Sequence, residues 1–188
     1  MKFGNLRTFV SALALGALWA VPQTASAETF KGEYIGVEGG ASTIKTTGNS
    51  FLSGPIDESN TDPIGVLLAG YRTPIRNNMP IVVGIEGEFG GTIDAFDTRF
   101  AASLIGGYSY RDEALLFARV GYASQSGLAT GTEHGLMLGG GAEVRLMKHV
   151  NVRVEYKNMD YGSTTTDPLG GFRKYRGHEI AGGLILDF

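Results

Sequence analysis

The sequence contains no cysteine, so neither disulfide bridges nor thiol chemistry contributes to its structure or function. It has only three histidines, and their spacing does not suit a metal site. After Val21, no stretch offers the roughly eighteen consecutive apolar residues that a transmembrane helix needs. Glycine is abundant instead, with 29 residues, and this argues against a helical protein.

The first residues have the form of a cleaved export signal. Lys2 and Arg7 form a short basic region, an apolar stretch follows, and Ala25-Ser26-Ala27 supplies the small side chains that signal peptidase requires. The alternative, a membrane anchor, would need a longer apolar stretch. We therefore expect a signal peptide at residues 1–27 and one domain at residues 28–188. Removing Lys2 and Arg7 leaves 14 of the 16 basic residues against 19 acidic ones, a net charge of −5, which argues against nucleic acid as a partner.

The rest of the chain alternates between apolar and polar residues, which is the period of a β-strand. Val152 and Val154 fall on one face of such a segment, and Arg153 and Glu155 fall on the other. Helical spacing would scatter these charges among the valines. Eight segments of this kind, bounded by turn residues, predict strands at Glu33–Ser42, Ile64–Thr73, Ile81–Phe89, Arg99–Tyr110, Ala114–Ala123, Glu133–Leu146, Val150–Met159 and Arg176–Phe188.

The apolar faces of these segments carry no Asp, Glu, Lys or Arg, whereas the opposite faces carry charges and many glycines. A soluble sandwich or lipocalin-like barrel also alternates, but larger residues usually fill its interior. Apolar faces toward lipid and a narrow charged lumen are typical of a membrane barrel. We expect the lumen charges to pair in a network, because an isolated buried charge is costly. Its members are Glu38, Glu86, Glu88, Arg119, Glu143, Arg145, Arg153, Glu155, Lys157 and Glu179.

Connection lengths give an independent indication of topology. Odd-numbered connections are the longer ones, led by the 21 residues of Thr43–Pro63, and even-numbered ones, such as Arg111–Glu113, are shorter. Outer-membrane barrels have short periplasmic turns and longer outer loops. We therefore predict an all-β fold, an eight-stranded antiparallel up-and-down transmembrane β-barrel. We expect it to be exported through the periplasm to the outer membrane of a Gram-negative bacterium, with both termini in the periplasm.

Several segments resemble a known family. Phe117–Ala123, Gly139–Arg145, and Val152–Tyr156 followed by Asp160-Tyr161-Gly162 look like the fifth, sixth and seventh strands of small outer-membrane β-barrel proteins. This family includes opacity-like surface antigens and "porin family" proteins, and is related in fold to the OmpA membrane domain. His178–Phe188 resembles the closing strand. The resemblance covers the second half of the chain by its residues and the first half by pattern only.

Two residue sets point to partners. Arg173, Lys174 and Arg176 form the densest basic patch, which is either a clamp for lipopolysaccharide phosphates or an ordinary loop. The outward stripe of the last strand resembles the C-terminal signal that the outer-membrane assembly machinery reads. That stripe consists of Ile180, Leu184, Leu186 and Phe188. We thus expect outer-membrane lipid, lipopolysaccharide and the assembly machinery as partners of a monomer.

These features favour a structural or surface-interaction role, such as membrane integrity, lipopolysaccharide contact or host contact. Eight strands enclose an interior just wide enough for side chains, so we expect a plugged lumen. The alternative is a narrow small-solute channel. A lipid A-modifying enzyme would need a serine, a histidine and an acid near the outer rim, where we expect His134 and His178, with Ser124, Ser126 and Glu133 in loose reach. The motifs of such enzymes are absent, so we predict no catalytic site, no metal site and no cofactor.

Overall fold

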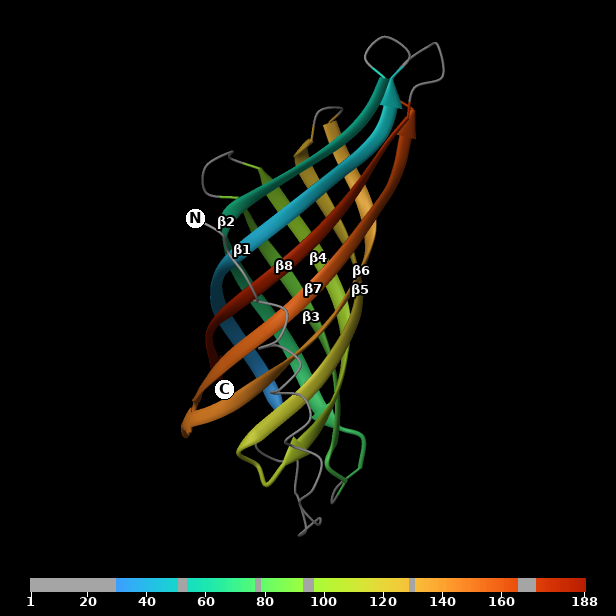
Figure 1. The fold of residues 1–188 in the computed structure, drawn as a ribbon. Coiled ribbons are helices and arrows are strands. Elements are labelled where there is room, and N and C mark those ends of the chain that lie inside the picture. Colours follow the sequence, from blue (N-terminus) through green and yellow to red (C-terminus); the bar gives the residue numbers. More distant parts are fainter. Residues whose placement is uncertain (1–29, 51–53, 77–78, 93–96, 129–130, 166–171) are drawn as a thin grey trace, which may run out of the picture.

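The computed structural model describes residues 30–50, 54–76, 79–92, 97–128, 131–165 and 172–188, so the expected signal peptide lies outside the described residues. Eight strands follow one another around a closed antiparallel ring, in which β1 also pairs with β8 (Figure 1). The predicted fold class is therefore confirmed. The strands are β1 (Gly32–Ser50), β2 (Gly54–Pro74), β3 (Ile81–Thr92), β4 (Thr98–Tyr110), β5 (Ala114–Leu128), β6 (Gly131–Met147), β7 (Val150–Thr165) and β8 (Phe172–Asp187).

Among the described residues, no helix has both the length and the apolar character needed to span a membrane.

The alternation in the sequence decides which side chains face outward. Ile85 on β3 is 60% exposed, whereas the next residue, Glu86, is 3% exposed. On β7, Val154 is 57% exposed and Glu155 is 2% exposed. The molecule thus has an apolar outer surface and a charged interior, the reverse of a water-soluble barrel. The faces predicted from the sequence have the correct orientation.

The two ends of the barrel differ. One end holds the start of β1, the finish of β8 and the turns that join β2 to β3, β4 to β5 and β6 to β7; we call it the terminal end. The opposite end is the distal end. There the β1–β2 hairpin stands highest above the ring (Figure 1).

The prediction of a long loop at Thr43–Pro63 is wrong, because most of this segment is strand. β1 continues to Ser50 and β2 already begins at Gly54, with paired residues along the whole hairpin. The hydroxyl oxygens of Thr43 and Thr61 lie 2.8 Å apart across this pair. β-Branched residues favour the extended backbone, and polar outward residues suit a hairpin that rises beyond the apolar band. The extra length at the distal end therefore lies in longer strands.

Glycines keep the lumen wide enough for the charged side chains. A Cβ atom at Gly139 would lie 3.1 Å from Cγ of Lys157 and 3.2 Å from Cγ of Arg119. At Gly36, a Cβ would lie 2.9 Å from Cδ1 of Leu68. Larger residues at these positions would compete with the side chains that fill the interior.

Candidate functional site

Buried charges fill the lumen. Of the described residues, seven carboxylates and five cations are at most 8% exposed. We call these twelve residues the charge lattice. The carboxylates are Glu38, Glu86, Glu88, Glu143, Glu155, Glu179 and Asp187, and the cations are Arg72, Arg99, Arg119, Arg153 and Lys157.

The lattice begins at the terminal end around two carboxylates. Nη2 of Arg72 donates to Oε1 of Glu143 at 2.8 Å and to Oδ1 of Asp187 at 2.5 Å. Nδ2 of Asn151 donates to the same two carboxylates, at 2.8 and 2.6 Å. Nη2 of Arg153 adds a contact of 3.1 Å to Oε2 of Glu143. Donors from β2 and β7 thus satisfy acceptors on β6 and β8.

Glu86 on β3 joins this end to the centre. Nη1 of Arg153 lies 2.6 Å from Oε2 of Glu86, and Nη2 of Arg119 lies 2.6 Å from Oε1. The hydroxyl of Tyr34 also donates to Oε2 at 2.7 Å. Nη1 of Arg119 in turn lies 2.6 Å from Oε1 of Glu88. Each arginine therefore bridges carboxylates, as the planar guanidinium allows.

Lys157 and Arg99 complete the lattice toward the distal end. Nζ of Lys157 lies 2.5 Å from Oε1 of Glu155, 2.9 Å from Oε1 of Glu179 and 3.2 Å from Oε2 of Glu88. Arg99 pairs with Glu179 and lies 3.2 Å from Oε2 of Glu88. Shared carboxylates make the lattice continuous along the lumen.

Two residues of the predicted network lie at its margins. The carboxylate oxygens of Glu38 are 3.9 Å from Nη1 of Arg153 and 3.8 Å from Nζ of Lys157, the longest ion pairs of the lattice. Arg145 is only partly buried, and it lines a hollow at the terminal end together with Lys148. The register of β6 shifts directly after Arg145, next to the β6–β7 turn, and Asp187 of the lattice lines the same hollow.

Arg72 and Arg99 belong to the lattice but were not among the residues predicted from the sequence, although the sequence contains a signal for both. Both are neighbours of exposed aromatic residues, Tyr71 and Phe100, whose side chains face outward. Successive side chains of a strand point to opposite faces, so the arginines must face the lumen. Both lie at or next to the ends of the predicted strands, and neither was assigned to the lumen-facing side.

Apolar clusters adjoin the lattice toward each end. Aromatic rings of the terminal cluster contact its arginines: the guanidinium carbon of Arg72 is 5.1 Å from the ring centre of Phe30, and that of Arg153 is 5.0 Å from the ring centre of Phe117. The terminal cluster contains Phe30, Val82, Ile105, Leu115 and Phe117. The distal cluster contains Ala101, Ala123, Met137, Met159, Tyr161 and Tyr175.

The predicted basic patch is divided between two faces of β8. Lys174 and Arg176 have the outward orientation, and both lie 3.4 Å from Oδ2 of Asp160. Arg173 shares the inward orientation of Tyr175 and does not lie with them. Lys45 on β1 pairs in register with Arg176 and adds a cation to the outward group. We call Lys45, Lys174 and Arg176 the distal cation group.

The aromatic pair of Tyr156 and His178 lies next to the distal cation group, on the side toward the terminal end. The hydroxyl oxygen of Tyr156 is 2.7 Å from Nδ1 of His178, and their rings stack with centres 6.2 Å apart. Tyrosine and histidine of this kind combine an apolar body with a polar tip, which suits the boundary between lipid and water. The cations of the group therefore lie just beyond the apolar band.

The predicted assembly stripe faces outward. Ile180, Leu184, Leu186 and Phe188 are all exposed, and Phe188 is 71% exposed. The backbone N–H of Phe188 donates to the carbonyl of Glu33 at 3.0 Å, so its backbone is fixed while its ring is free to contact lipid or a partner.

The residues considered for catalysis do not form a triad. Ser124 and His134 are partners in the β5–β6 register, and both face outward. The ring of His134 stacks with Tyr122 at 6.0 Å. Glu133 lies on the opposite face of β6, so it cannot orient His134 as the acid of a triad does.

One solved structure shows the same fold, and two others are more distantly similar. Neisserial surface protein A is 19% identical over 83% of this chain and 97% of its own, with a TM-score of 0.51, which shows the fold. OprG from Pseudomonas aeruginosa is 13% identical over 84% of this chain and 96% of its own, with a TM-score of 0.47. The outer membrane protease OmpT from Escherichia coli is 10% identical over 87% of this chain and 100% of its own, with a TM-score of 0.46.

A search of curated proteins finds no match. The profile of one family, the outer membrane protein beta-barrel domain, matches residues 11–188. The match extends over most of the sequence, including all eight strands. The chain therefore belongs to the outer membrane protein beta-barrel domain family and is located in the cell outer membrane.

Proposed function

We propose that this protein is a non-conducting barrel with a structural and surface-interaction role, oriented with its terminal end toward the periplasm. The charge lattice supports this proposal most strongly. Each of its five cations contacts at least two carboxylates, and an apolar cluster adjoins the lattice toward each end of the lumen. Conduction requires sites that ions can enter and leave, whereas these side chains are bound to one another.

The same lattice argues against a small-solute channel. Ion pairs in a narrow lumen offset the cost of removing charges from water only while they remain together. A solute would have to break several of them to pass. Among the described residues, Asp160 is an outward acid on the neighbouring strand β7, but it pairs with Lys174 and Arg176, so we do not propose hydrolysis by Ser124 and His134.

We expect the purified, refolded protein to produce no resolvable current steps in a planar lipid bilayer. Insertion is checked by the heat-modifiable migration of the folded protein on a gel. The reason is the continuous packing of charged and apolar side chains through the lumen. Regular steps that grow with salt concentration would contradict the proposal and support a narrow pore.

For the surface role, we propose that the distal cation group binds lipopolysaccharide phosphates. Lys45, Lys174 and Arg176 lie just beyond the apolar band, at the level where phosphates of an outer leaflet would lie. Lys45 is 3.1 Å from Asp57, and the other two share Asp160, so their side chains are already directed along the outer surface. Phosphate oxygens can replace these carboxylates as acceptors.

We expect the double variant Lys174→Gln/Arg176→Gln to bind lipopolysaccharide about tenfold more weakly, because each cation near an anionic surface contributes on the order of 1 kcal/mol, partly offset by Asp160. Binding of the folded protein to immobilised lipopolysaccharide measures this. Arg76→Gln/Lys148→Gln, at the terminal end, is the matched control. Equal binding of dephosphorylated lipopolysaccharide by the wild type would show that the phosphates are not recognised.

We also propose that the assembly machinery recognises the outward stripe that ends at Phe188. Its exposed ring, held on a fixed backbone, supports this role.

A further inference from the structure

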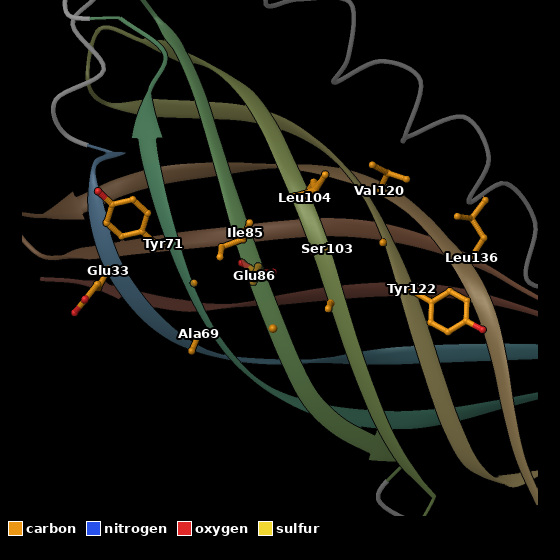
Figure 2. A pocket seen from close by; sticks show the side chains of 14 residues that line it. Glu33, Ala69, Tyr71, Ile85, Glu86, Ser103, Leu104, Val120, Tyr122 and Leu136 are labelled. Carbon is orange, nitrogen blue, oxygen red and sulfur yellow. The ribbon is translucent and has the colours of Figure 1, made fainter.

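An apolar groove crosses the outer surface of β2, β3, β4 and β5, between Glu33 on β1 and Leu136 on β6 (Figure 2). Its volume is about 860 Å³. The floor consists of Ala69, Gly87 and Ala102, which pair with one another in register across β2, β3 and β4. All three face outward and are exposed, so the hollow opens toward the hydrocarbon of the membrane.

Larger side chains border the floor on both sides. The row toward the distal end contains Leu67, Phe89 and Phe100, and the row toward the terminal end contains Tyr71, Ile85 and Leu104. The rings of Phe89 and Phe100 have centres 4.8 Å apart and form a continuous wall. Four neighbouring strands extend over about 14 Å, which is long enough to hold much of an acyl chain.

The mouth of the groove lies at the terminal end, where Glu33 and Tyr71 are partners in the β1–β2 register. Figure 2 shows both side chains at the same end, with Tyr122 and Leu136 at the other. The carboxylate of Glu33 faces outward and is exposed, and within the part of the chain that the structure describes it forms no ion pair. An exposed carboxylate at the edge of the apolar band is placed to bind a cationic group at the membrane surface.

We infer that the groove binds a phospholipid with a primary ammonium headgroup, such as phosphatidylethanolamine, in the periplasmic leaflet. One acyl chain lies over Ala69, Gly87 and Ala102 between the two walls. The ammonium group, with its positive charge and three donors, binds Glu33, and the hydroxyl of Tyr71 is placed to donate to the phosphate. The chain gains close contacts because the floor residues are small. The site rests on the proposed orientation but not on the closed lumen.

Native mass spectrometry of the folded protein tests the headgroup. The probes are palmitoyl-oleoyl phosphatidylethanolamine, phosphatidylcholine and phosphatidylglycerol, offered at equal concentration. We expect one retained phosphatidylethanolamine, preferred about threefold over the other two, as for an ion pair at an aqueous interface. Glu33→Gln should abolish this preference, and Glu113→Gln, at the β4–β5 turn outside the groove, should not. Equal retention of the three lipids by the wild type would overturn the assignment of the headgroup.

A second pair of variants tests the groove itself. A Cβ at Gly87 would have only the carbonyl oxygen of Ala69, at 4.0 Å, within contact distance, so Gly87→Leu can fill the hollow without displacing its neighbours. It should reduce retention of phosphatidylethanolamine several-fold. Gly106→Leu is the matched control, because Gly106 also faces outward with nothing within 4 Å of a Cβ, and it lies outside the groove.

Two results would contradict the inference. One is an equal loss of lipid in Gly87→Leu and Gly106→Leu. The other is a dimer in the wild type that Gly87→Leu dissociates, since a second copy of the chain would then occupy the groove. Planar-bilayer current is measured on the same preparations, so that failure of the lipid site and failure of the closed lumen are distinguished.

Discussion

Replacing Arg153 with alanine should destabilise the barrel by about 3–5 kcal/mol, the cost of breaking a buried ion pair by removing one partner. Arg153 is 1% exposed, and its guanidinium lies 2.6 Å from Glu86 and 3.1 Å from Glu143. Without it, Glu143 keeps Arg72 but Glu86 loses one of its two cations. Urea-induced unfolding of the protein in lipid vesicles, followed by circular dichroism, measures the change in the free energy of unfolding.

In the same variant, water can instead enter the lumen and solvate the carboxylates that no longer contact Arg153. In that case the loss of stability is smaller and a small conductance opens in a planar bilayer. Arg176→Ala, an exposed arginine of the distal cation group, is the control and should change stability by no more than about 0.5 kcal/mol. If Arg153→Ala left both the unfolding curve and the current unchanged, the lattice would not hold the lumen closed.

Replacing Leu138 with arginine should cost about 2–4 kcal/mol if this position lies near the middle of the bilayer. Leu138 on β6 is 50% exposed and faces outward, with Val120 of β5 and Asn158 of β7 as its register partners. An arginine there must reach the membrane surface or bring water with it. Unfolding of the refolded protein from vesicles measures this difference.

Thr132→Arg is the matched control for that substitution. Thr132 lies on the same strand and the same face as Leu138, three outward positions nearer the distal end. An arginine near the edge of the bilayer costs only about 0–1 kcal/mol. Equal effects of the two substitutions would mean that the apolar surface does not face lipid at the depth assigned to it.

The orientation of side chains could be predicted from the sequence because a strand has a period of two. Glu86, Glu155 and Glu179 face the lumen as predicted from alternation alone. The partners of each charge could not be predicted in the same way. They depend on the curvature of the closed ring, which brings β3 close to β7 across the lumen, as in the pair of Glu86 and Arg153.

Two further features were missed for physical reasons. Leu115 and Phe117 have the inward orientation and form an apolar cluster beside the charges, whereas only polar and small residues were predicted at inward positions. The β1–β2 hairpin was interpreted as a loop because its polar outward residues, such as Thr43 and Thr61, lack an apolar face. A strand that rises beyond the bilayer needs no such face.

Partners in the charge lattice are far apart along the chain. Arg72 and Asp187 are separated by 115 residues, Arg99 and Glu179 by 80, and Glu86 and Arg153 by 67. An open sheet of the first six strands would therefore keep pairs such as Arg99 with Glu88 but would lack the counter-ions that β7 and β8 supply. Those counter-ions arrive only when β7 and β8 join and the seam with β1 closes. Closure of the ring should accordingly be cooperative, with a partly closed sheet in the bilayer as a high-energy state.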